Sequence, residues 1–184
     1  MILIIIIILW YTSTNYKGVF MKKLLFVVIL SLLFVVLNGC GEKVYPSYIT
    51  AENIYAIESD KYFVYFEKEN CSQCEATLPS VIDYLTKTKN KKDSPYIYRV
   101  LLEFTDENGE LVKLPISRAL DENSGQGPNG NFYVDGVKNW VALYIAATPS
   151  LIEVTNVDGT RQSKLVAVGT TEIETYLTNL QNGK

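Results

Sequence analysis

The chain has 184 residues, which is the length of one domain or of one domain preceded by a leader. It carries 17 basic and 20 acidic residues, a net charge of −3, and no histidine. This balance offers no basic patch, so it argues against a protein that binds nucleic acid or an anionic surface by charge.

Residues 21–40 have the pattern of a secretory signal: the pair Lys22 and Lys23, a largely apolar run over 24–37, and small residues before Cys40. The run is shorter than the roughly 20 apolar residues of a membrane span. "LNGC" resembles a bacterial lipobox, with Asn38 as a departure, so we expect 21–39 to be a lipoprotein signal peptide and Cys40 to be lipidated. A signal-anchor helix is the alternative. Both place the rest of the chain outside the cytoplasm.

Residues 1–20 fit neither a signal nor a domain, since their apolar part is too short to cross a bilayer. We expect Met21 to be the true start and 1–20 to be a misannotated upstream extension. A chain that begins at Cys40 has 145 residues. The three lysines before Cys40 reduce the basic residues to 14, and the net charge to −6.

After a linker over 40–48, the chain alternates between helical and strand patterns. Residues 50–59 predict a short helix that Thr50 caps. The aromatic and β-branched run 61–67 predicts a buried strand. Residues 75–89 have helical spacing, and Pro79 inside them predicts a kink, because proline costs about 3 kcal/mol in a helix.

Further along, residues 94–106 predict a strand and residues 147–169 predict two strands joined by a turn at 156–159, where Asp-Gly favours a hairpin. Thr171 and Glu174 have capping-box spacing at the start of a last helix over 170–180. Strands that alternate with helices and end in a hairpin predict an α/β fold, a central mixed β-sheet flanked by helices.

Three cysteines are present, and if Cys40 carries lipid, Cys71 and Cys74 remain as a CxxC pair outside the cytoplasm, where disulfides persist. Two thiols without histidine do not make the four ligands of a zinc site, although a dimer could share a metal. A loop this short contributes little as a structural brace. A redox couple is the favoured interpretation, with no metal and no cofactor.

These residues resemble the thioredoxin family. "CSQCEATLP" has the family's C-x-x-C-x4-P spacing at a strand-to-helix junction, with Pro79 as its proline. Thr148 and Pro149 match the cis-proline loop that faces the cysteines, and Gly169 matches the glycine before the last helix. The resemblance covers residues 48–181 and implies a thioredoxin-like domain over 49–181, in which Thr148 and Pro149 bind the substrate chain.

Three departures from the family pattern stand out. Asn70 occupies the place of a tryptophan, and Tyr65 the place of a buried aspartate that serves as a proton relay. Glu67 is a candidate substitute for that acid, unless it faces solvent. An insertion before the cis-proline loop is expected over about 106–140.

Within the insertion, the glycine-rich stretch 121–131 suggests a calcium loop, but Gln126 and Phe132 stand where such a loop needs Gly and Glu. A flexible loop that borders the active site is the better interpretation.

We therefore expect a thiol-disulfide oxidoreductase that is anchored at the outer face of the cell membrane. Cys71, at a helix N-terminus, would be the catalytic nucleophile and Cys74 the resolving thiol. Client proteins or peptides with thiols or disulfides would be its partners, and a membrane redox partner would supply electrons if it is a reductase. The alternative is a non-catalytic thioredoxin-like accessory protein, such as those of bacteriocin export systems, which share this general layout.

Overall fold

The computed structural model describes residues 42–120 and 130–183. The chain divides into two units, residues 1–42 and residues 43–184. All described elements belong to the second unit. The signal peptide, Cys40 and most of the stretch 121–131 lie outside the described residues, so the sequence predictions for them remain predictions.

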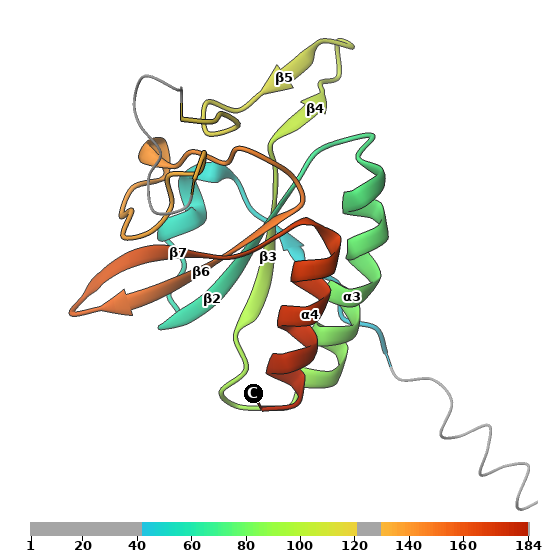
Figure 1. Ribbon diagram of the computed structural model, residues 1–184, viewed down its shortest axis with the longest axis vertical. Coiled ribbons are helices and arrows are strands. Elements are labelled where there is room, and N and C mark those ends of the chain that lie inside the picture. The colour runs from blue at the N-terminus through green and yellow to red at the C-terminus, as the bar shows by residue number, and fades with distance from the viewer. Residues whose placement is uncertain (1–41, 121–129, 184) are drawn as a thin grey trace, which may run out of the picture. The chain divides into compact units, whose positions relative to one another are not determined.

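A mixed five-stranded sheet forms the centre of the unit (Figure 1). β2 pairs in parallel with β3 and antiparallel with β6, so it lies in the middle of the sheet. β1 and β7 form the edges, the first parallel to β3 and the second antiparallel to β6. In spatial order the strands are β1 (Ser47–Tyr48), β3 (Tyr96–Leu101), β2 (Lys61–Glu67), β6 (Ser150–Val157) and β7 (Thr160–Val168).

The central strand β2 is buried from its second residue to its last. Its side chains alternate between the two faces of the sheet, as the period of two in a strand requires. Phe63 and Tyr65 pack on one face, and Tyr62, Val64 and Phe66 pack on the other. The continuous apolar run that the sequence shows at 61–67 is therefore a strand covered on both faces.

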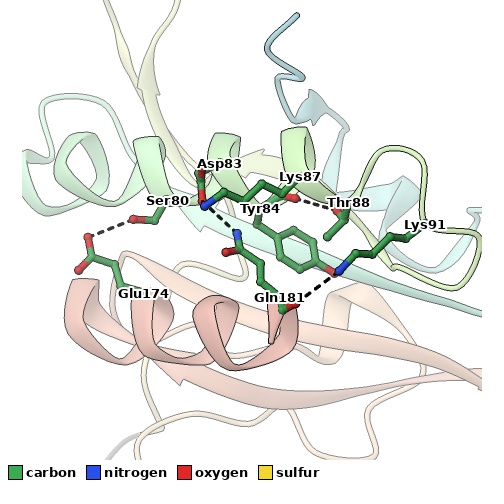
Figure 2. A network of polar contacts seen from close by, with 8 residues as sticks. All are labelled: Ser80, Asp83, Tyr84, Lys87, Thr88, Lys91, Glu174 and Gln181. Carbon is green, nitrogen blue, oxygen red and sulfur yellow. Dashed lines mark hydrogen bonds and ion pairs between the residues drawn. The ribbon is translucent and has the colours of Figure 1, made fainter. Parts of the chain in front are cut away.

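Two helices, α3 (Ser72–Thr88) and α4 (Gly169–Gln181), cover the first face (Figure 1). Val81 and Leu85 from α3 pack with Ile173 and Leu177 from α4 in one cluster. Polar contacts join their outer surfaces, where Ser80 donates to Glu174 (Figure 2). This α/β architecture, with its βα start, mixed sheet and two helices, is consistent with a thioredoxin-like topology and confirms the predicted fold class.

Local details differ from the sequence predictions. The first helix is a short 3-10 helix, η1 (Ala51–Tyr55), and Thr50 makes no side-chain capping bond. The predicted strand 94–106 is two strands, β3 and β4 (Glu103–Thr105), because the chain leaves the central sheet at Leu102. Leu102 donates its N–H to the carbonyl of Glu67, so it still lies beside the end of β2.

The capping box predicted at Thr171 and Glu174 is wrong. α4 begins two residues earlier, at Gly169, and its N-cap is Val168, which has no capping side chain. Glu172 instead accepts the Val168 N–H at 3.0 Å. Gly169 has φ of 77°, a region that side chains disfavour, which explains the helix start at a glycine.

The second face of the sheet is covered by η1 and by the segment between β4 and β6. This segment begins with β5 (Leu111–Lys113), which pairs with β4, and later contains η2 (Trp140–Ala142). Its buried side chains join the core around β2 and β6; they are Ile116, Phe132, Val134, Val137, Leu143 and Ile145. Four of these side chains, from Ile116 to Val137, lie in the region predicted as an insertion, so that region contributes to the hydrophobic core.

Ser163 on β7 joins this segment to the sheet. Its hydroxyl, almost fully buried, donates to the carbonyl of Val134 at 2.7 Å and lies 2.7 Å from the hydroxyl of Tyr55. Its backbone N–H donates to Val137, and its carbonyl accepts from Gly136. The edge of β7 is thereby paired at this point, which protects it from pairing with another chain.

Substitution of Ser163 by alanine is expected to lower the free energy of unfolding by about 2 kcal/mol, because it leaves buried polar partners unsatisfied. Urea denaturation measures this change, and hydrogen exchange should show the loss of protection over residues 133–145. Lys164→Ala, at the exposed neighbouring position, is the control. Equal stability of the two variants would contradict this role of Ser163.

Candidate functional site

The site lies where β2 ends and α3 begins. Three residues, Lys68 to Asn70, separate Glu67 from Cys71, and the turn passes through Asn70 with φ of 55°. Asn tolerates this left-handed conformation better than most side chains do. The residue that stands in place of the family's tryptophan thus shapes the turn that delivers Cys71 to the helix.

Cys71 and Cys74 form a disulfide across the first turn of α3, as the redox interpretation requires. Cys71 is the N-cap, and its sulfur accepts the N–H of Cys74 at 3.1 Å. Cys71 is 8 % exposed and Cys74 3 % exposed, so Cys71 is the more accessible of the two. The free N–H groups and the positive end of the helix dipole both favour a negative charge on the Cys71 sulfur.

The tertiary structure brings Thr148 and Pro149 to the cysteines, although they lie more than seventy residues away along the chain. The Thr148–Pro149 peptide bond is cis. The Thr148 hydroxyl lies 3.9 Å from the sulfur of Cys71. The carbonyl of Pro149 accepts the N–H of Gly169 at 2.8 Å, which joins this loop to the start of α4.

Tyr65 lies beneath the first turn of α3. Its side chain is fully buried, and its hydroxyl donates to the carbonyl of Cys74 at 3.1 Å. Burial raises the pKa of Tyr65 above its ordinary value, so the phenol stays protonated and remains a donor. The position that carries an acid in the family pattern is here a hydrogen-bond donor to the backbone of the CxxC turn.

Glu67 does not face solvent, since only 5 % of it is exposed. Its carboxylate pairs with Arg99 of β3 at 2.5 Å and accepts a hydrogen bond from Tyr48 of β1 at 2.9 Å. The ring of Tyr48 also covers the guanidinium of Arg99, at 4.4 Å. Burial, followed by the nearby Glu67, raises the pKa of Tyr48. The candidate relay acid is thus the centre of a buried ion pair.

The β4–β5 hairpin borders the turn that precedes Cys71, a contact that the sequence did not reveal. Glu69 donates its N–H to the carbonyl of Glu103 at 3.0 Å, and its side chain accepts the N–H of Thr105 at 2.7 Å. The hairpin therefore holds the turn through which β2 leads to Cys71.

Sequence reasoning also missed Arg99, although a signal for it was present. An arginine within the aromatic and apolar run 96–101 is a charged residue in a buried strand, and such residues are nearly always paired. Glu67 at the end of the neighbouring run was the available partner.

A groove elsewhere in the domain is separate from the CxxC turn. A groove of about 290 Å³ lies between α3 and α4, lined by Ser80, Asp83, Glu174 and their neighbours, and it includes neither cysteine. Among residues 42–120 and 130–183, no three His, Cys, Asp or Glu side chains are grouped so as to hold a metal. In the same part of the chain, no helix combines the length and the apolar character that a membrane crossing needs.

No protein-family model matches the chain, and no curated protein matches it either. The interpretation therefore depends on the fold and on the geometry of the CxxC turn. What these support directly is a redox site: a CxxC pair at disulfide distance at the start of a helix in a thioredoxin-like α/β fold.

Replacement of Glu67 by glutamine should destabilise the protein by about 3 kcal/mol, because it leaves the Arg99 charge buried without its counter-ion. Urea denaturation of the oxidised protein is the measurement. Glu75→Gln, at an exposed position in the first turn of α3, should change stability little. A Glu67→Gln variant as stable as the wild type would show that the ion pair contributes nothing to the native state.

Proposed function

We propose that the protein is a membrane-anchored, extracytoplasmic thiol-disulfide oxidoreductase that exchanges disulfides with client proteins through Cys71 and Cys74. The observation that carries the proposal is the disulfide in the first turn of α3, with Cys71 as the N-cap and Thr148 beside its sulfur. A disulfide in this position closes too short a loop to brace the fold. Thiol-disulfide exchange explains the presence of this disulfide better than a structural role does.

In the reducing direction, the thiolate of Cys71 attacks one sulfur of a client disulfide and releases the other client sulfur as a thiolate. The protein and client are then joined by a mixed disulfide. Cys74 loses its proton and attacks the sulfur of Cys71, which releases the second client thiolate. The client gains two electrons and, once both sulfurs are protonated, two protons, while Cys71 and Cys74 become the disulfide. The oxidising direction is the reverse.

The site gives each cysteine a different role. Cys71 is the more exposed of the two, and the N–H of Cys74 is directed at its sulfur. Helix N-termini of this kind lower thiol pKa values to about 3.5–7.5 in CxxC proteins, which makes Cys71 the nucleophile. Cys74, almost fully buried, acts only within the protein. Thr148 and Pro149 would bind the client backbone next to Cys71.

The location at the membrane rests on the sequence. Lipidation of Cys40 would hold the domain at the outer face of the membrane, and the linker 40–48 would connect the lipid to the domain. Disulfides persist in such an oxidising compartment. As a reductase the protein would take electrons from a membrane redox partner; as an oxidase it would transfer its disulfide to clients.

Trapping experiments test the proposal. In Cys74→Ser, the mixed disulfide at Cys71 cannot be resolved. We therefore expect client proteins to accumulate in covalent complexes, which dithiothreitol separates by reducing the mixed disulfide. The double variant Cys71→Ser/Cys74→Ser is the matched control and should trap none. Measurement of the Cys71–Cys74 reduction potential against glutathione would then give the direction of exchange. A Cys71→Ser variant that keeps full function in the cell would favour the non-catalytic accessory role instead.

A further inference from the structure

The peptide unit between Gln73 and Cys74 is hydrogen-bonded at both ends. Its N–H donates to the sulfur of Cys71 at 3.1 Å. Its carbonyl accepts from the hydroxyl of Thr77 at 2.7 Å and from that of Thr170 at 3.2 Å. A continuous hydrogen-bonded path therefore leads from α4, through one peptide group, to the sulfur of Cys71.

The next peptide unit repeats the pattern. The N–H of Glu75 donates to the carbonyl of Cys71 at 3.0 Å, and the carbonyl of the same peptide, on Cys74, accepts from Tyr65. Both peptide groups that point their N–H at Cys71 thus receive hydroxyl hydrogen bonds on their carbonyl side. The hydroxyls come from β2, α3 and α4.

Thr77 and Thr170 differ in what their contacts indicate. A threonine that bonds to the carbonyl four residues earlier is common in helices, and Thr77 does this with Gln73. Thr170 lies 97 residues from Gln73, on another helix, so its bond is not a by-product of local geometry. The two hydroxyl oxygens are also 2.9 Å apart. Each hydroxyl has one hydrogen, so Thr77 donates either to Gln73 or to Thr170, and in both cases Thr170 donates to Gln73.

Hydrogen bonds in such a series polarise one another, so donation to the Gln73 carbonyl strengthens the N–H of Cys74 as a donor. A bond from this N–H to a thiolate is charge-assisted and stronger than a bond to a neutral sulfur. Donation to the Gln73 carbonyl therefore stabilises the thiolate of Cys71 more than it stabilises the thiol or the disulfide.

We propose that Thr170, together with Thr77, is a positioning residue that stabilises the Cys71 thiolate through the Gln73–Cys74 peptide. The inference deepens the proposed function, because it identifies what in α4 regulates the reactive thiol. Through these hydrogen bonds, the start of α4 affects the reactivity of the Cys71 thiol at the start of α3.

Other ionisable groups surround this turn and act on the same thiolate. They are Glu75 on α3, Glu172 on α4, Tyr65 and Glu67 on β2, Arg99 on β3, and Lys68 and Glu69 in the preceding turn. A hydroxyl-to-methyl change at Thr170 leaves all of them in place. Any change in the pKa of Cys71 then reports the lost hydrogen bond.

The test compares Thr170→Val, which removes the hydroxyl but keeps the shape, with Thr170→Ser, which keeps the hydroxyl. Thr171→Val, at the exposed next position, is the matched control. In the reduced full-length protein, the pH dependence of iodoacetamide alkylation is followed by mass spectrometry of the peptide that contains Cys71. We expect Thr170→Val to raise the pKa of Cys71 by a few tenths of a unit, a roughly twofold loss of thiolate below that pKa. Thr170→Ser and Thr171→Val should match the wild type.

An unchanged Cys71 pKa in Thr170→Val would overturn the inference, and a lower unfolding free energy alone would show that Thr170 is only a brace between helices. If Thr170→Val fails to fold, Thr170→Ala removes the same hydroxyl and is compared with Thr170→Ser. Iodoacetamide needs no client, so the two proposals can fail separately. A shifted pKa without trapped clients would contradict only the exchange function, and trapped clients with an unshifted pKa would contradict only the role of Thr170.

Discussion

The buried central strand β2 is the constraint on which the rest of the structure depends. It pairs with a parallel strand on one side and an antiparallel strand on the other, and its side chains fill both halves of the core. A strand in this position has no face exposed to solvent. The helices on one face and the covering segments on the other therefore pack against the same strand. That end is Glu67, from which the chain turns directly into the CxxC helix. The disulfide therefore lies at the end of the buried central strand.

Burial at the end of β2 also explains the polar chemistry beneath the cysteines. Glu67 cannot remain charged there without compensation, since removal of a carboxylate from water costs several kcal/mol. Arg99 on β3 and Tyr48 on β1, the edge strand beyond it, supply that compensation. Tyr65, two residues earlier on the same face, contributes a donor that needs no counter-ion. Two residues of β2 thus divide these roles: Glu67 is the acid, and Tyr65 is the hydrogen-bond donor to the turn.

The three segments that meet at Cys71 come from distant parts of the chain. The CxxC turn follows β2, the loop with Thr148 and Pro149 precedes β6, and Gly169 begins α4. The hydrogen bond from Gly169 to Pro149 and the bonds of Thr170 to the first turn of α3 tie the three together. The start of α4 therefore contacts both the first turn of α3 and the loop that contains the cis-proline.

Local patterns were sufficient for β2, the hairpin and the two long helices, because each has a clear apolar period or a glycine-containing turn. They failed where a neighbour decides the outcome. The break at Leu102 occurs because the chain turns to pair with β5, and α4 begins at Gly169 because of the backbone conformation that glycine allows there. The region around 106–140 was predicted as an insertion, since its apolar side chains are too scattered to show a period. In the structure, Ile116, Phe132, Val134 and Val137 from this region pack on the second face of the sheet.

The sequence by itself determined the fold class, the CxxC pair at a helix start and the absence of an acid at Tyr65, because these depend on residue type and short-range spacing. Only the tertiary structure decided that Glu67 is buried against Arg99, that Thr148 lies beside Cys71 and that Thr170 reaches the Gln73 carbonyl. Each of these contacts joins residues from different elements. Their partners are fixed by how the sheet and helices pack, which no short window of the sequence contains.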